Sequence, residues 1–148
     1  MEKNRIDRAL ALFAAGYNCA QAIFTAYAAG EEIPERLALS LPSAFGGGIA
    51  RMGETCGAVS GSFMVIGRHA GRLEKDPLMI KECAYAMVEE FVDAFAARHG
   101  SIRCRDLLGY DLSNPADYAR VKAEDVIGQR CPAFVRSAAE VLESVLGL

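Results

Sequence analysis

The regular spacing of apolar residues between Pro77 and Gly100 constrains the fold more than any other feature of the sequence. These residues recur at intervals of three and four, at Ile80, Ala84, Met87, Phe91 and Phe95. This spacing places them on one face of an α-helix, and that face must be covered by other parts of the chain. Pro77 suits the first turn of such a helix and Gly100 its end. The pattern therefore predicts a long amphipathic helix over 77–99.

Helical periodicity extends over nearly the whole chain, whereas alternating, strand-like runs are scarce. Asn18 is placed to cap a helix that Gly30 would end, and Pro42 with the triplet Gly46–Gly48 marks a loop. The expected helices cover 5–15, 19–29, 34–41, 56–72, 77–99 and 116–127, with a short turn around Cys104 and a last helix starting at Cys131-Pro132. No shift in composition marks a boundary, so we expect one all-α domain over 1–148, a bundle of about six or seven helices.

Charge and hydropathy argue against several classes of function. A net charge of −3 without a basic stripe gives no support to nucleic-acid binding. The uncharged run from Ala9 to Gly30 follows a leader of mixed charge and is interrupted by Gly16, Asn18 and Gln21. We therefore expect neither an export signal nor a membrane span, and we infer a cytoplasmic protein. No dinucleotide-binding glycine motif, P-loop or Ser-His-Asp signature is present, so NAD, FAD and ATP are not expected.

The chain has five cysteines, and four of them are expected in the first turns of helices. These four are Cys19, Cys56, Cys104 and Cys131. Free backbone N–H groups and the positive end of the helix dipole lower the pKa of a thiol there and favour the thiolate, which is both nucleophile and metal ligand. Nearby arginines in the sequence would add to this effect: Arg51, Arg103, Arg105 and Arg130. Cys83 lies beside the apolar stripe of the long helix and is expected to pack in the core.

Glycines surround the second of these cysteines. Gly53, Gly57 and Gly61 are spaced four apart, which would leave a bare strip where a backbone, a sulfur or a small inorganic centre can approach. The triplet Gly46–Gly48 could form a nest of amide donors for an anion. Each feature also has a simpler interpretation, since such spacing is common in close helix packing and glycine triplets are common in turns.

The order of these residues resembles a known family. Cys19, the motif CGAVSG over 56–61, Cys104 and Cys131 follow one another as in the small redox-active proteins named for a C…CGAxxG…C…C pattern, and the preceding FGGGIARMGET is also similar. The resemblance covers essentially the whole chain. It implies an all-helical cytoplasmic protein whose four motif cysteines act together, in redox chemistry or as ligands of an iron-sulfur or other metal centre. Cys83 is outside the pattern.

Three functions are compatible with the sequence. In the first, Cys56 is a thiolate of low pKa that attacks a disulfide or oxidant, and another motif cysteine resolves the intermediate. In the second, the four thiolates hold an iron-sulfur cluster for electron transfer or, less favoured, a structural zinc ion. The separations of 37, 48 and 27 residues between successive motif cysteines are unlike those of ordinary zinc ribbons and ferredoxins. In the third, the chain is a helical interaction module, with a homodimer formed through its small-residue face.

The sequence does not decide whether the protein is an oxidoreductase or an accessory of electron transfer. Its expected partner is a redox protein or a small-molecule oxidant or reductant. His69 and His99 each fall near a predicted helix end, where an imidazolium is favourable, so we expect caps rather than metal ligands.

Overall fold

The computed structural model describes residues 4–148, and residues 1–3, the start of the charged leader, lie outside the described part. The all-α prediction is confirmed, because the described residues form helices and no strand beyond one isolated bridge. They form more helices than the six or seven expected: α1 Arg5–Ala14, α2 Cys19–Ala28, α3 Glu35–Ser40, the 3₁₀ helix η1 Ser43–Phe45, α4 Gly46–Ile49, α5 Gly57–Leu73, α6 Pro77–His99, α7 Cys104–Leu108, α8 Pro115–Ala123 and α9 Val126–Leu146.

Local signals set several of the helix ends. The Asn18 side chain accepts from the Gln21 N–H at 2.9 Å, and the Gln21 side chain accepts from the Asn18 N–H at the same distance, which forms a capping box. Asp76 caps α6 with Pro77 in its first position, and Gly100 ends that helix in the left-handed conformation with φ 82°. The predicted span 77–99 is therefore correct at both ends.

The last two helices differ from the prediction. The break falls at Glu124–Asp125 instead of Gly128, and α9 begins at Val126. Asp125 adopts φ 50°, and the Gln129 N–H donates to the Asp125 carbonyl at 3.1 Å, so helical bonding is established before Pro132. Pro132 lies inside the helix.

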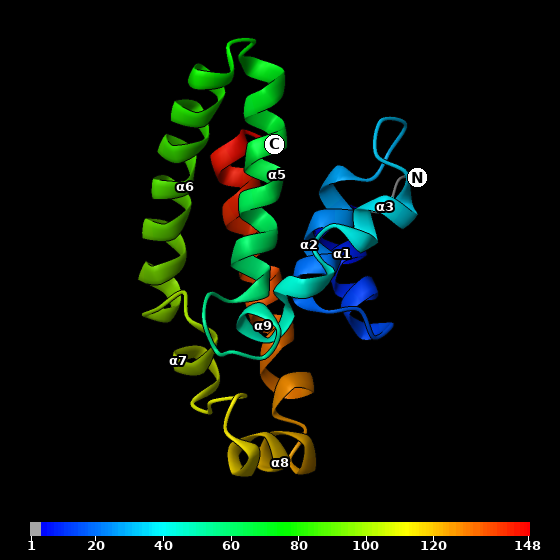
Figure 1. Cartoon of the computed structure of the whole chain (residues 1–148), viewed down its shortest axis with the longest axis vertical. Helices are drawn as coiled ribbons and strands as arrows, with labels where there is room; N and C mark the ends of the chain where they lie inside the picture. Colours follow the sequence, from blue (N-terminus) through cyan, green and yellow to red (C-terminus); the bar gives the residue numbers. More distant parts are fainter. Residues whose placement is uncertain (1–3) are drawn as a thin grey trace.

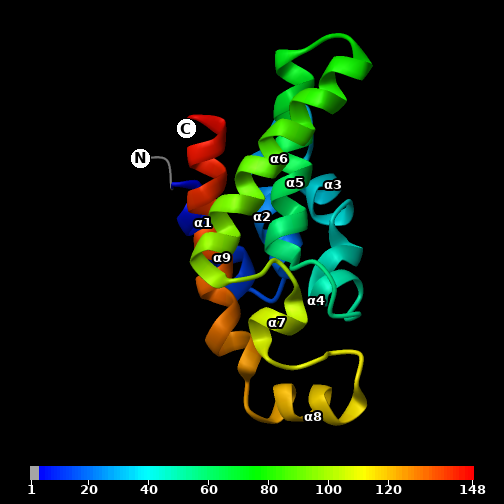
Figure 2. The ribbon, with the colours of Figure 1, turned by 90° about the vertical axis from the view of Figure 1, so that its left-hand side faces the viewer.

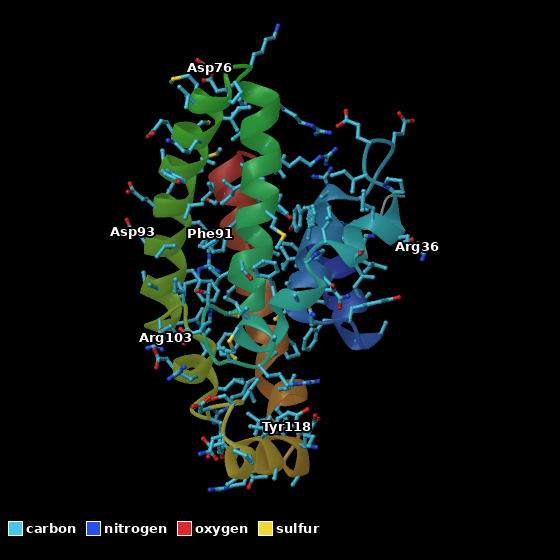
Figure 3. All side chains as sticks on the ribbon, viewed as in Figure 1. Arg36, Asp76, Phe91, Asp93, Arg103 and Tyr118 are labelled. Atoms are coloured by element: carbon cyan, nitrogen blue, oxygen red, sulfur yellow. The ribbon has the colours of Figure 1, made fainter. Side chains whose placement is uncertain are left out.

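The main core lies where α2, α5, α6 and α9 meet, with α1 on its edge. α5 and α6 form an antiparallel hairpin, and α9 runs alongside it (Figure 1). Phe91 points from α6 toward α5 (Figure 3), where its ring meets the edge of Phe63 at a centroid distance of 5.9 Å. The largest side chains that are almost completely buried include Phe91, Phe95, Ile23, Ile66, Leu108 and Leu142.

A second, smaller core joins α7 and α8 to the start of α9 at the lower end of the molecule (Figure 2). It is built from Leu108, Leu112, Val121 and Val126, together with Cys104. The motif cysteines divide between the two cores: Cys56 belongs to the main core and Cys19 packs against it, while Cys104 belongs to the small core and Cys131 packs against that one. The boundary between the two cores is therefore where the four thiols can meet.

Candidate functional site

All four motif cysteines line a single cavity of about 610 Å³ between the two cores. Cys56 and Cys104 are buried, whereas Cys19 and Cys131 remain partly exposed. The rest of the lining comes from the segment before α2, the glycine loop before α5, and the start of α9. Residues more than a hundred positions apart in the sequence thus share one pocket, which has the volume typical of a small-molecule site.

Cys19 is the first residue of α2. The capping box of Asn18 and Gln21 fixes the start of this helix, so the free amides of its first turn surround the Cys19 sulfur. The N–H groups of Cys19 and Ala20 stabilise its thiolate, and so does that of Ala58 from α5. The expectation that Cys19 lies in a first turn behind the capping Asn18 is confirmed.

Cys56 and Cys104 are held beside each other by backbone hydrogen bonds. Thr55 and Arg103 form an antiparallel bridge. The Cys56 N–H donates to the Ile102 carbonyl at 2.7 Å, and the Cys104 N–H donates to the Glu54 carbonyl at 2.6 Å. Cys56 is the residue just before α5 and Cys104 the first of α7, so one bridge fixes two helix starts and their thiols.

Cys131 does not lie at a helix start, contrary to the expectation. It is in the second turn of α9, because that helix begins five residues earlier at Val126. The unpaired amides of the first turn are therefore not available to its sulfur. Burial and the nearby thiols Cys19 and Cys104 raise the pKa of Cys131 well above its ordinary value.

Gly57 and Gly61 bring α2 and α5 together at the cysteines. A Cβ atom on Gly57 would lie 2.5 Å from the Cys19 Sγ, and one on Gly61 would lie 2.9 Å from the Ala20 carbonyl oxygen. The bare strip thus admits a sulfur and a neighbouring backbone. The strip is covered by α2, so the expected homodimer through this face is not available.

Gly53 has a different role from the other two glycines. It adopts φ 72°, and the atoms nearest to a Cβ at this position would be those of the Asp111 carboxylate and the Arg105 side chain. Its expected place in the strip is therefore wrong, because the chain turns before α5 begins.

The glycine loop forms an unusual left-handed turn. Residues 47–51 all have positive φ, at 67°, 67°, 65°, 48° and 65°. Three of these residues carry side chains, and each costs about 1–2 kcal/mol in this conformation. The turn is held by the Gly53 and Glu54 N–H groups, which donate to Gly47 and Gly48 carbonyls at 3.2 and 2.9 Å. Gly48 packs against Cys104, since a Cβ there would be 2.7 Å from the Cys104 Cβ.

The Cys19 and Cys56 thiols lie close enough for the ionisation of one to affect the pKa of the other. Contact with the Cys56 thiol lowers the pKa of Cys19 to about 7, although burial opposes this shift. The same contact, together with burial, raises the pKa of Cys56 well above its ordinary value. The expectation that Cys56 is the thiolate stays a prediction for the pair as a whole, within which the contact with Cys56 and the amides of Ala58, Cys19 and Ala20 lower the pKa of Cys19.

Cys104 is held in its protonated form. Burial raises its pKa to about 12, and a charge on Cys19 adds to the rise, while Arg105 opposes it. Of the four motif cysteines, Cys19 is the one whose thiol ionises near neutral pH.

The guanidinium groups of the four arginines expected near the thiols make their closest contacts with other groups. Arg103 and Arg105 pair with Glu54 at 3.4 and 3.0 Å, and the Arg130 guanidinium donates to the Leu108 carbonyl at 2.6 Å. Arg51 lines the cavity but places its guanidinium 5.4 Å from the centre of the Tyr118 ring. The helix amides and the thiol pair, more than the arginines, therefore set the charge on sulfur.

The remaining candidates lie outside the cavity. Cys83 is half-buried on α6 and does not line it. His99 lies in the last turn of α6, as expected, and its half-buried ring packs between the Phe95 and Phe134 rings at centroid distances of 4.8 and 5.1 Å. Among residues 4–148, no three His, Cys, Asp or Glu side chains are grouped closely enough to hold one metal ion. None of the described helices has the length and apolar character needed to cross a membrane.

A comparison with protein families agrees with the cysteine pattern. The model of the family described as "Putative redox-active protein (C_GCAxxG_C_C)" matches residues 17–145. The match contains all four cysteines of the cavity. No curated protein and no solved structure matches the chain. The family description supports a redox role in general, and the chain belongs to this C_GCAxxG_C_C family.

Proposed function

We propose that this protein is a thiol-disulfide redox protein in which Cys19 and Cys56 form the reversible disulfide. The observation that carries the proposal is the direct contact between these two thiols, one with a lowered and one with a raised pKa. The contact depends on Gly57, because any larger residue would displace the Cys19 sulfur. A pair of neighbouring thiols in which one ionises more readily contains both a nucleophile and the group that resolves the intermediate.

The pair can exchange with a disulfide without any further reactant. With a pKa of about 7, about half of the Cys19 thiol is ionised at pH 7. Its sulfur attacks one sulfur of the substrate disulfide and forms a mixed disulfide, and the other substrate sulfur leaves as a thiolate. The Cys56 proton passes to that thiolate. The Cys56 sulfur then attacks Cys19, which forms the Cys19–Cys56 disulfide and releases the second substrate thiolate, so two electrons pass from the protein to the substrate.

The cavity supports a low-molecular-weight disulfide as substrate. Its volume of about 610 Å³ is within the range of small-molecule sites. Cys19 and Cys56 both line this cavity, and Cys19 is the more exposed residue of the two, which favours it as the point of attack. Cys104 and Cys131 stay protonated at neutral pH and have no part in the first attack.

An iron-sulfur cluster is the second candidate, and the cavity lined by four thiols favours it. Such a cluster takes four thiolate ligands, which here would be Cys19, Cys56, Cys104 and Cys131. When bound, it would supply one-electron transfer. A single zinc ion would need the sulfurs at about 2.3 Å from one point. The absence of a group of three ligands among the described residues makes zinc the weaker alternative.

Oxidation of protein prepared without air separates these candidates. Iron, zinc and the visible absorption spectrum are measured first. The protein is then titrated with 2-hydroxyethyl disulfide, and the remaining thiols and the new bonds are identified by mass spectrometry. We expect two thiols to be lost and a Cys19–Cys56 bond to form.

Three variants sharpen the test. Cys19→Ser and Cys56→Ser should each abolish the paired loss of thiols, whereas Cys83→Ser is the matched control and should behave as the parent protein. Stoichiometric iron with charge-transfer bands would replace the thiol proposal with the cluster. Cys19 and Cys56 that remain reduced in metal-free protein would refute it.

A further inference from the structure

Two side chains of opposite charge line the cysteine cavity. They are Arg51, from the left-handed turn, and Asp125, the residue before α9. Apart from the Cys19 thiol, every other lining residue is uncharged at neutral pH. None of the ion pairs formed by residues 4–148 includes Arg51 or Asp125. A cavity that displays one cation and one anion is complementary to a ligand that carries both charges.

Arg51 is held at the cavity by a glycine and an aromatic ring. Its Cγ packs against Gly47, where a Cβ atom would lie 3.0 Å away. Its guanidinium lies 5.4 Å from the centre of the Tyr118 ring, and the Lys122 ammonium lies 4.6 Å from the same centre. A contact with a ring face leaves the N–H groups of a guanidinium able to donate to a carboxylate. Two positive charges therefore meet at one ring, and this corner of the cavity attracts an anionic group.

The other carboxylates of this part of the chain have partners of their own. Asp111, Asp117 and Glu124 each accept a hydrogen bond from a group within the same segment, at 2.6, 2.9 and 3.3 Å in that order. None of the three lies at ion-pair distance from Arg51 in the described part of the chain. The carboxylate that remains for the cavity is that of Asp125.

The Asp125 carboxylate lies against the first turn of α9. A Cβ atom on Gly128 would be 2.5 and 2.6 Å from its two oxygens, so a side chain at this position would displace the carboxylate. Gly128 also lines the cavity. Asp125 is exposed, and its side chain accepts no capping hydrogen bond from the amides of α9. The carboxylate is thus available to an ammonium group in the cavity.

We propose that the substrate of the cavity is the disulfide of an α-amino acid, with a carboxylate bound by Arg51 and an ammonium group bound by Asp125. The proposal rests on the thiol function proposed above and names its substrate class. Such a disulfide carries one carboxylate and one ammonium group on each half, so it meets both charges at once. Cys19 and Cys56 give two electrons and two protons to its S–S bond, and two molecules of the amino-acid thiol leave.

A panel of four disulfides that differ in charge tests the assignment. 2-Hydroxyethyl disulfide is neutral, 3,3′-dithiodipropionate carries only carboxylates, cystamine carries only ammonium groups, and cystine carries both. The second-order rate constant for loss of the Cys19 and Cys56 thiols is measured with each at neutral pH. Each constant is divided by that for the neutral disulfide, which removes any change in the reactivity of Cys19 itself.

Each charge should affect its own members of the panel. Arg51→Gln should lower the ratio about fivefold for dithiodipropionate and cystine, which is the upper end of what an exposed ion pair contributes. Asp125→Asn should lower it about fivefold for cystamine and cystine. Arg36→Gln and Asp93→Asn are the matched controls, because each removes the same charge from an exposed side chain that lies away from Tyr118 in Figure 3. Both controls should keep the ratios of the parent protein.

A binding measurement separates this proposal from the thiol function. Cystathionine has a CH₂ group in place of one sulfur of cystine, so it binds without reacting. Its affinity for the reduced protein, measured by calorimetry, should fall about fivefold in R51Q and in D125N. Thiols that resist all four disulfides, with cystathionine binding lost in these variants, would refute the thiol function and support the amino-acid site.

Two results would overturn the substrate assignment. The first is oxidation by the neutral disulfide with ratios in R51Q and D125N equal to those of the two controls, which would leave the thiol function standing. The second is a parent protein that does not bind cystathionine.

Discussion

Gly57→Ala tests the link between helix packing and thiol chemistry. The added Cβ would lie 2.5 Å from the Cys19 Sγ, 3.0 Å from the Phe45 carbonyl oxygen and 3.1 Å from the Ala20 nitrogen. Non-bonded carbon atoms pack at about 3.5–4.0 Å, so the first contact is about 1 Å too short. Either the Cys19 side chain rotates away or α2 and α5 separate, and both changes break the contact with Cys56.

The expected cost follows from two opposing terms. Overpacking of this kind costs about 1–3 kcal/mol. Replacing glycine by alanine in a helix stabilises the folded state by at most about 1 kcal/mol. We therefore expect the free energy of unfolding to fall by about 1–2 kcal/mol, measured by urea denaturation of the reduced protein followed by circular dichroism.

Gly67→Ala is the control because it lies in the same helix with open space where its Cβ would be. The free energy of unfolding of G67A should rise by about 0.5–1 kcal/mol from helix propensity alone. The thiol readout is the pH dependence of iodoacetamide alkylation at Cys19, identified by mass spectrometry. Its pKa of about 7 should rise in G57A and stay the same in G67A. A G57A protein as stable as G67A, with the Cys19 pKa unchanged, would refute this reasoning.

Two further predictions concern the left-handed turn and His99. Ala50→Gly should raise the free energy of unfolding by about 0.5–1 kcal/mol, since relief of the left-handed strain outweighs the entropy cost of glycine. Gly48→Ala should lower the free energy of unfolding by about 3 kcal/mol, because its Cβ would meet the Glu54 nitrogen at 2.6 Å. Urea denaturation of both variants should therefore show stability changes of opposite sign. Changes of the same sign would contradict the strain argument. Burial, and to a lesser extent Arg98, lowers the pKa of His99, whose Nε2 is buried without a hydrogen-bond partner. Folding therefore favours the neutral imidazole. Its contribution to the free energy of unfolding is complete above the ordinary pKa of about 6.5 and decreases as the pH drops through that value. His99→Leu should reduce this slope between pH 7.5 and pH 5, and an unchanged slope would contradict the assignment.

Much of the helical architecture could be predicted from the sequence because its signals are local. The span of α6 follows from its apolar spacing, from Asp76 and Pro77 at the start, and from Gly100 at the end. The start of α2 follows from Asn18. Such signals act within one or two turns, so a single sequence is enough to interpret them. The same local rules failed at α9, where Gly128 and Pro132 resemble a break but are tolerated inside a helix that begins at Val126.

The chemistry of the site was decided by tertiary structure. Cys56 was expected to be the thiolate, and within the pair the pKa of Cys19 is lowered, because a thiol 37 residues away and an amide of α5 contact its sulfur. Arg103 and Arg105, adjacent to Cys104 in the sequence, turn toward Glu54 instead. The sequence by itself determined many of the helix starts, among them those of α2 and α6, and which thiols exist. Only the packing of α2 on α5 decided which sulfur carries the charge, because a pKa depends on the groups that lie within a few ångströms in space, wherever they stand in the chain.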